Sequence, residues 1–453
     1  MNKREFLKAS GFTITSSMLS RVLHAEAAQT GEGSAPRTNW SGNYTYSAPN
    51  LLQPTTVEEV QSIVRRCSHL RGLGSRHSFN GIADSRENQI SLTALKSIEL
   101  DPAAKTVTVG AGVRYGDLAP VIDAKGFAVH NLASLPHISV AGAIATATHG
   151  SGLHNGNLAT AVSGLEFVAA NGEITRLTRA TDSATFHGAV VHLGALGILT
   201  RVTLDVQPTY QVAQTVYLDL PFDQLQHHLR DVFASGYSVS IFTDWQRGRA
   251  TQVWIKRRTD QSYPTALGAE FYGARRATEK MHPITGHPAE ACTEQLGIPG
   301  PWYERLPHFR MNFTPSSGHE LQSEYFVPLE HGYEAIRAVE TLRDQITPHL
   351  FVTELRTIAP DDLWMSMAHE RPSMTVHFTW KPEWPVVRKI LPQIEAKLAP
   401  FNPRPHWGKL FTLSGAKVDR EYPRLGEFKA LARRYDPQGK FRNEFLDTNL
   451  YSS

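Results

Sequence analysis

Two charged side chains lie two residues apart in a run that otherwise has the composition of a buried strand. Glu354 and Arg356 belong to residues 350–358, which are rich in apolar and β-branched types. Residues two apart in a strand point to the same face of a sheet, so this pair would share one face. In a later run His377 and Thr379 would also share a face. Such a face can line a pocket for a polyol, whose many hydroxyls need directional hydrogen bonds. A solvated sheet face with a weak surface ion pair fits the pattern as well.

A third polar segment sets a lysine beside a tryptophan and a glycine. Arg404-Pro405-His406-Trp407-Gly408-Lys409 has residue types that suit the wall of a ligand site. By itself it fits a structured loop around a buried tryptophan better.

Residues 137–152 contain few bulky side chains. Small residues let the backbone approach a ligand closely, and successive N–H groups can then hold a phosphate. A tightly packed helix or turn fits the same composition equally well. Three hydroxyl groups in the segment could add hydrogen bonds, those of Ser139, Thr146 and Ser151.

A glycine pair precedes this segment but does not form a standard dinucleotide fingerprint. Gly72-x-Gly74 continues to His77, where the GxGxxG pattern needs a third glycine. No P-loop occurs either. A dinucleotide would therefore not bind in the Rossmann manner.

The elements that would position these residues fall into two regions with different patterns of predicted secondary structure. Up to about residue 206 helices and strands alternate: a Thr56–Glu59 capping box begins a helix, residues 105–109 alternate as a strand, and residues 115–125 read as a helix. From about residue 210 strands dominate, and this predicts a second domain with a large, mostly antiparallel sheet that carries helices on one face. The predicted strands are 212–218, 239–243, 251–256, 320–327, 350–358 and 374–380, with a helix over 331–343, loops over 259–307 and helix-and-turn structure over 421–445.

Composition excludes several classes of function. The chain has 453 residues, and its net charge of +3 gives no field for nucleic acid. No stretch reaches the roughly 18 apolar residues of a membrane span. The only cysteines are Cys67 and Cys292, which excludes a disulfide scaffold or a thiolate zinc cluster and leaves one bridge open.

The first thirty residues have the layout of an export signal. A basic start, Lys3-Arg4, is followed by a mildly apolar stretch and by Ala25-Glu26-Ala27, a small-x-small cleavage pattern. This resembles a twin-arginine signal, with Lys3 in place of the first arginine and Arg21 within the apolar run. We expect export to the periplasm; the alternative is an N-terminal tail on a cytoplasmic protein.

Several segments in the right order resemble one enzyme family. Gly72-Leu73-Gly74-Ser75-Arg76-His77-Ser78-Phe79, the run 134–142 and Thr148-His149-Gly150-Ser151-Gly152 resemble the FAD domain of the vanillyl-alcohol-oxidase superfamily. Glu354-Leu355-Arg356 and His406-Trp407-Gly408-Lys409 resemble its sugar-oxidising branch, the alditol (xylitol) oxidases and aldonolactone oxidases, with alditol oxidases the nearer. The match runs from Asn39 to about Phe445.

The resemblance implies an α+β fold of two domains. It predicts an export signal at 1–30, an FAD-binding PCMH-type domain at 31–210, a cap or substrate domain at 211–405, and a C-terminal segment at 406–453 that returns to the FAD domain. We expect a monomer and no metal.

The resemblance also implies a cofactor, FAD, bonded covalently through His77. Arg76, beside it, stands where lactone oxidases tend to carry a small residue, and its long side chain would either crowd the cofactor or reach a phosphate. The implied cofactor-binding residues are Gly72, Gly74, Ser75, His77, Ser78, Ser139, Gly142, Thr146, His149, Gly150, Gly197 and Ile198.

The implied reaction is oxidation of the primary C1 hydroxyl of an alditol such as xylitol or sorbitol, with hydride passing to flavin N5 and electrons then to O2, giving H2O2. Arg356, Lys409 and Glu354 would be catalytic: the two cations would stabilise developing negative charge, and Glu354 would orient them. The implied substrate-binding residues are Ser134, Glu354, Arg356, Thr379 and Lys409.

Three alternatives stay open at this point. One is oxidation or dehydrogenation of D-arabinono-1,4-lactone or L-gulono-1,4-lactone on the same fold, and another is an electron acceptor other than O2. The third is a non-catalytic sugar-binding protein, which would be colourless where a flavoprotein is yellow.

Overall fold

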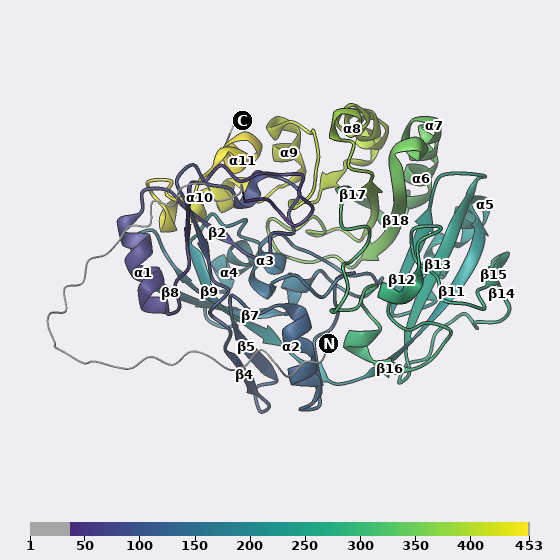
Figure 1. The fold of residues 1–453 in the computed structure, drawn as a ribbon, viewed down its shortest axis with the longest axis horizontal. Helices are drawn as coiled ribbons and strands as arrows, with labels where there is room; N and C mark the ends of the chain where they lie inside the picture. Colours follow the sequence, from purple (N-terminus) through teal and green to yellow (C-terminus); the bar gives the residue numbers. More distant parts are fainter. Residues whose placement is uncertain (1–36, 452–453) are drawn as a thin grey trace, which may run out of the picture. The chain divides into compact units, whose positions relative to one another are not determined.

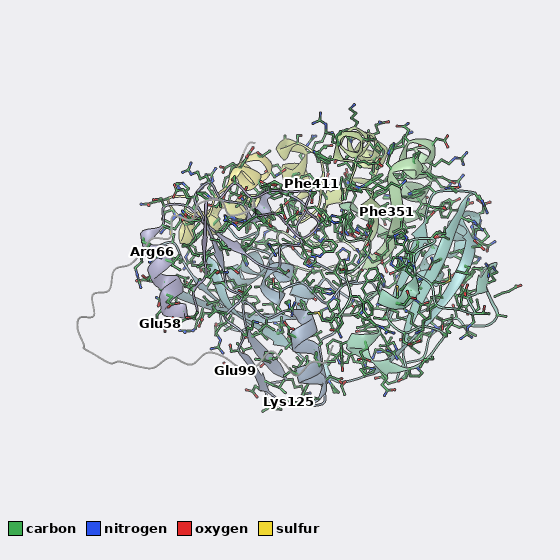
Figure 2. All side chains as sticks on the ribbon, in the orientation of Figure 1. Glu58, Arg66, Glu99, Lys125, Phe351 and Phe411 are labelled. Carbon is green, nitrogen blue, oxygen red and sulfur yellow. The ribbon has the colours of Figure 1, made fainter. Side chains whose placement is uncertain are left out.

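The computed structural model describes residues 37–451 (Figure 1). Its first helix shows how local sequence sets the elements. Helix α1 (Val57–Arg66) is capped by Thr56, whose hydroxyl accepts from the backbone N–H of Glu59 at 3.2 Å. The carboxylate of Glu59 accepts from the N–H of Thr55 at 2.6 Å, so the predicted capping box forms with its return bond one residue earlier. The charged side chains of Glu58 and Arg66 point outward (Figure 2).

The N-terminal part of the described chain contains three small sheets. Strands β1 (Asn50–Leu52), β3 (Asn88–Ser91) and β2 (Leu70–Leu73) pair in parallel in that order. An antiparallel sheet has the order β4 (Ile98–Asp101), β5 (Thr106–Gly110), β9 (Ile198–Asp205), β7 (Val162–Val168), β8 (Ile174–Thr178). Strands β6 (Phe127–Ala128) and β10 (Gln207–Pro208) form a pair. The helices here are α2 (Tyr115–Asp123), α3 (Val140–Ala145) and α4 (Ser183–Val190).

The predicted strands after residue 210 all occur, in one ten-stranded antiparallel sheet. Its order is β14 (Glu270–Phe271), β15 (Ala274–Arg276), β11 (Gln211–Pro221), β13 (Arg249–Arg258), β12 (Ser238–Thr243), β18 (Leu350–Ile358), β19 (Ser373–Trp380), β17 (Leu321–Pro328), β20 (Arg404–Pro405), with β16 (Gly300–Pro301) pairing β11. This confirms the α+β class and the large antiparallel sheet. The domain boundary at 210/211 stays a prediction.

Helices cover one face of this sheet, and the polar side chains predicted for the site project from the other face. Helix α5 (Phe222–Ala234) packs on β11 and β12, and α6 (Gly332–Glu340) packs on β17 and on α8 (Trp384–Leu398) (Figure 1). The predicted helix over 331–343 ends at Glu340, and a short helix α7 (Arg343–Ile346) follows. Apolar side chains such as Leu355 and Val376 alternate with the polar ones along the strands and are fully buried.

The chain after the large sheet is helical, as predicted, with α9 (Gly415–Glu421), α10 (Leu425–Tyr435) and α11 (Glu444–Leu446). Cys67 and Cys292 are free thiols, so the bridge left open by the sequence does not form. Within residues 37–451 no helix is long and apolar enough to span a bilayer. The predicted export signal lies outside the described residues.

Candidate active site

One cavity joins the glycine-rich segments to the polar face of the large sheet. Its empty volume, which includes space open to solvent, is about 1800 Å³. Sixteen of the residues predicted from sequence line it. They are Gly72, Gly74, Ser75, His77, Ser78, Ser134, Ser139, Gly142, Thr146, His149, Gly197, Ile198, Glu354, Arg356, Thr379 and Lys409.

Gly150 is the predicted residue that lies elsewhere. A Cβ added there would meet the side-chain oxygen of Asn131 at 2.7 Å. Only glycine lets the two segments come this close, so Gly150 packs the backbone behind the cavity instead of lining it.

The register of three strands builds the polar wall. Glu354 of β18 pairs with His377 of β19, and His377 pairs with Glu324 of β17. Paired residues in an antiparallel sheet share a face, so these three side chains form one row across the sheet. Arg356 and Thr379 lie on the same face because each is two residues from a member of the row.

Glu324 holds two cations. Its Oε1 accepts from Arg356 Nη2 at 2.8 Å, and its Oε2 accepts from Lys409 Nζ at 2.8 Å. Its side chain is fully buried, and Arg356 also donates to the hydroxyl of Ser134 at 3.3 Å. Burial alone would raise the pKa of Glu324, but Lys409 and Arg356 lower it well below its usual range. The carboxylate therefore stays charged and keeps both cations aimed at the cavity.

The cations respond differently to burial. Burial lowers the pKa of Lys409, and Glu324 offsets part of that effect. Burial would also lower the pKa of Arg356, but Glu354 and Glu324 raise it. Arg356 is therefore a permanent charge, whereas the charge on Lys409 depends on its carboxylate partner.

Three histidines around the cations are neutral. Burial lowers the pKa values of His149 and His406, and it lowers that of His377 to about 4. Ligand atoms of His149, Glu324 and His406 lie within 4.8 Å of one another, a spacing that could suit a metal ion. Because Arg356 and Lys409 already occupy both oxygens of Glu324, the electrostatics disfavour a cation there.

Glu354 is held from the side opposite Arg356. His308 Nε2 lies 2.8 Å from its Oε1, while Arg356 Nε and His377 Nδ1 each lie 3.6 Å from its Oε2. Neither ring nitrogen of His377 has a hydrogen-bond partner among residues 37–451, although both are buried. A ligand hydroxyl in the cavity would satisfy Oε2 and one of these nitrogens.

The small-residue wall is built around Ser139. Its hydroxyl caps α3 by accepting from the N–H of Gly142 at 3.3 Å, and its own N–H donates to the Ser75 hydroxyl at 3.1 Å. A Cβ on Gly74 would meet the Ser139 hydroxyl at 2.7 Å, and one on Gly142 would meet it at 2.8 Å. Glycine at both positions leaves the backbone open to the cavity. This cradle fits the phosphates of a bound dinucleotide such as FAD.

His77 lies at the middle of this wall. Its ring stacks on Trp40 with centroids 4.9 Å apart, and burial lowers its pKa to about 3. The imidazole is thus neutral and carries a free lone pair. The adjacent Arg76 has a left-handed backbone (φ 64°), and its side chain reaches the carbonyl of Thr38 at 3.5 Å.

Sequence reasoning did not assign Glu324, His308 or Lys256 to the site. Glu324 stands in a predicted strand, in a polar alternation with Gln322 that repeats the Glu354–Arg356 pattern. That signal could have found it. His308 lies in a stretch predicted as loop, and nothing local distinguishes it.

Comparisons with known proteins agree with this geometry. Residues 48–178 match the family model described as FAD binding domain, and residues 314–449 match that described as D-arabinono-1,4-lactone oxidase. The chain is 49% identical to alditol oxidase from Streptomyces sp. (strain IKD472 / FERM P-14339), over 90% of this chain and 97% of that one.

More distant relatives match over most of the length of this chain. L-gulono-1,4-lactone dehydrogenase of Mycobacterium tuberculosis is 27% identical over 90% of this chain and 97% of its own. Among solved structures, a solvent-stable cholesterol oxidase superposes with a TM-score of 0.72 at 14% identity, covering 91% of this chain and 96% of that one, which shows a shared fold. This chain belongs to the alditol oxidase family, within the vanillyl-alcohol-oxidase superfamily of FAD-dependent oxidoreductases, close to the aldonolactone oxidases.

Proposed function

We propose that this protein oxidises the primary C1 hydroxyl of alditols such as xylitol or sorbitol, with FAD as cofactor and O2 as final acceptor. The observation that carries the proposal is the polar wall: two carboxylates and two cations line the cavity that also contains the glycine cradle, and all are buried except Lys409, which is partly buried. The 49% identity to an alditol oxidase supports the same substrate class.

The wall offers complementary partners along a linear polyol. Ser134 and Thr379 provide hydroxyls that can donate or accept, and Glu354 provides an acceptor in Oε2. Arg356 and Lys409 provide only donors. A chain of hydroxyls can satisfy all five groups, whereas a short alcohol leaves some of them buried and unpaired.

Charge on the wall favours loss of a hydride from C1 and of a proton from the C1 hydroxyl. FAD, when bound, supplies the hydride acceptor and the route of the electrons to O2. As the hydroxyl loses its proton, negative charge develops on its oxygen, and Arg356 with Lys409 stabilises that charge. His377 is neutral, and its ring nitrogens have no hydrogen-bond partner in the described part of the chain, so it can accept the proton.

A second candidate is oxidation of a γ-lactone. The match of residues 314–449 to the lactone-oxidase model favours it. The fold and the FAD cradle would serve both reactions equally. The two differ in the substrate's shape, because a ring cannot reach the same spread of donors as an extended chain.

A chain-length series separates the two. From sorbitol and xylitol down to glycerol, we expect kcat/KM to fall roughly tenfold for each hydroxyl lost, since an unpaired buried group costs about 1–3 kcal/mol and about 1.4 kcal/mol is tenfold. Peroxide release measures turnover, and the product should be the aldose. A flat series, or a lactone that outruns every polyol, would transfer the assignment to the lactone-oxidase branch.

We also propose that FAD is attached covalently through His77. The imidazole lines the cavity, where it is neutral and stacked on Trp40. Both features support a ring nitrogen free to bond the flavin.

His77→Ala should remove the covalent bond and leave weakly bound FAD. Denatured wild-type protein should then give a fluorescent flavin band on a gel under acid, and the variant should give none. Trp40→Phe, which keeps an aromatic neighbour for the ring, serves as the control. A fluorescent band from the alanine variant would locate the attachment at another residue.

Export is proposed from the sequence of residues 1–30. Periplasmic and cytoplasmic fractions, compared with and without those residues, test it.

A further inference from the structure

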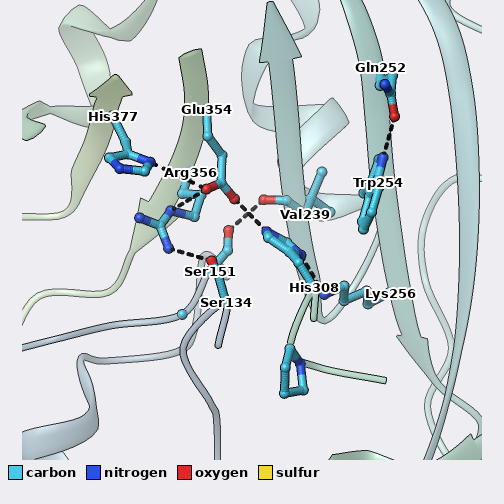
Figure 3. Close-up of polar contacts among 12 residues, drawn as sticks. Ser134, Ser151, Val239, Gln252, Trp254, Lys256, His308, Glu354, Arg356 and His377 are labelled. Carbon is cyan, nitrogen blue, oxygen red and sulfur yellow. Dashed lines mark hydrogen bonds and ion pairs between the residues drawn. The ribbon is translucent and has the colours of Figure 1, made fainter. Parts of the chain in front are cut away.

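A line of buried polar groups leads from Glu354 through His308, which also lines the cavity, to Lys256, which does not (Figure 3). His308 Nε2 contacts Glu354 Oε1 at 2.8 Å, and Lys256 Nζ contacts His308 Nδ1 at 3.0 Å. Lys256 Nζ also donates to the carbonyl of Leu306. Lys256 is 1% exposed and does not line the cavity, so it cannot contact the substrate directly.

Counting donors and acceptors fixes the state of the histidine. An ammonium group has only donors, so His308 Nδ1 must accept from Lys256. The ring proton of a neutral imidazole is then on Nε2, which donates to Glu354 Oε1. Burial and the Lys256 charge lower the pKa of His308 to about 4, so the ring carries a single proton.

Packing prevents the ring from escaping this arrangement. Trp254 and Phe242 flank the ring edge-on, with centroids 5.1 Å and 5.5 Å away. The backbone N–H of His308 donates to the carbonyl of Ser134 at 2.7 Å, which ties the histidine to a residue of the cavity wall. These contacts fix the position of the imidazole ring, so only its tautomer is free to change.

We propose that Lys256 is a positioning residue for Glu354: through His308 it fixes the tautomer that donates to Oε1, which leaves Oε2 of Glu354 turned to the substrate. The inference rests on the proposed function, because it assigns Oε2 to a polyol hydroxyl. If Lys256 loses its charge, its lone pair can accept a hydrogen bond from the Nδ1–H tautomer of His308. The lone pair of Nε2 then faces the carboxylate, and Glu354 Oε1 loses the hydrogen bond from His308.

The buried surroundings of Lys256 make its charge change near neutral pH. Burial lowers the pKa of Lys256 to about 7, and the charged or titratable groups around it are Glu354, Cys292, Arg356 and His308. Because the charged form of Lys256 is the active one, kcat/KM for a polyol should be high below this pKa and fall as the pH rises through it.

The test compares three variants of the holoenzyme. Lys256→Met removes the donor and the charge. Lys256→Gln supplies an N–H donor that cannot titrate. The matched control is Gln214→Met, because Gln214 pairs with Lys256 across β11 and β13 and is a buried polar group that donates to a backbone carbonyl.

For xylitol at about pH 6 we expect Lys256→Met to lower kcat/KM roughly tenfold, the scale of one mispaired buried hydrogen bond. The fall in kcat/KM near pH 7 should vanish in both Lys256 variants and remain in Gln214→Met. Lys256→Gln should keep more activity than Lys256→Met.

A readout independent of turnover is the ¹⁵N-histidine NMR spectrum, with the His308 signals assigned by their loss in His308→Gln. Wild type should show the Nε2–H tautomer at about pH 6, and Lys256→Met should show a mixture. If the pH step survives in the Lys256 variants, or if Lys256→Met matches the control throughout, the proposal is wrong. If Lys256→Met does not fold, Lys256→Gln decides alone. Failure of the proposed function would appear differently, as a wild type that does not oxidise polyols.

Discussion

Replacing Lys409 by methionine should lower kcat for xylitol by about 10²–10³, with a much smaller change in KM. The ammonium of Lys409 lies on the cavity wall and is held by Glu324 Oε2 at 2.8 Å. A partly buried cation that is fixed in place before reaction needs no reorganisation when charge develops on the substrate oxygen. The neutral hydroxyl of the bound polyol gains less from it, so the loss appears in the transition state.

Steady-state kinetics under saturating O2 measure this effect, and flavin absorbance confirms that the cofactor is retained. Lys440→Met is the matched control, because Lys440 donates to the carbonyls of Val64 and Ala170 away from the cavity. Its kcat should equal that of wild type. A Lys409 variant with intact kcat and raised KM would mean that this lysine only holds the substrate.

The elements of the fold were predictable because their signals are local. The alternation of apolar and polar residues gave each long strand of the large sheet to within a few residues, and the capping box gave the start of α1. The predicted helix over 331–343 was too long at its end, since α6 stops at Glu340. Periodicity alone does not show where a helix gives way to a second short one.

The site was predictable in part, for a physical reason. Glu354 and Arg356 share a strand, so their common face follows from spacing alone. The charge partner of Arg356, Glu324, cannot be predicted from spacing, because it reaches Arg356 only through the pairing of β17 and β18 with β19. The role of His308 depends on a loop that crosses the sheet, and no local pattern encodes that path. Gly150 shows a further limit, because in a sequence a glycine needed for packing looks the same as one needed for a ligand.

Glu324→Gln should lower the free energy of unfolding by about 3–5 kcal/mol, although the side chain touches no solvent and changes little in size. Both oxygens of Glu324 are paired with cations. The variant therefore leaves buried Arg356 and partly buried Lys409 with Glu354 as the one remaining carboxylate of the row, and of these two cations Glu354 contacts only Arg356, at 3.6 Å. Urea denaturation of the holoenzyme at about pH 6 measures the loss. The matched control is Glu395→Gln, a buried carboxylate behind the same sheet that accepts from the hydroxyl of Tyr325 at 2.8 Å.

The dependence of this loss on pH follows from the pKa of Glu324. That pKa is lower in the folded chain than in the unfolded one, so the carboxylate stabilises the fold above the unfolded value of about 4.3. Its contribution disappears as the pH falls through the folded value. The difference in unfolding free energy between wild type and variant should therefore hold at about pH 5–6 and narrow below about pH 4.

The activity of the variant should depend on pH in the opposite direction. Without Glu324 the pKa of Lys409 falls further, so the variant should lose kcat as the pH rises and recover part of it in mild acid. A variant as stable as Glu395→Gln, with a pH profile like that of wild type, would show that Glu324 does not hold the charge on Lys409.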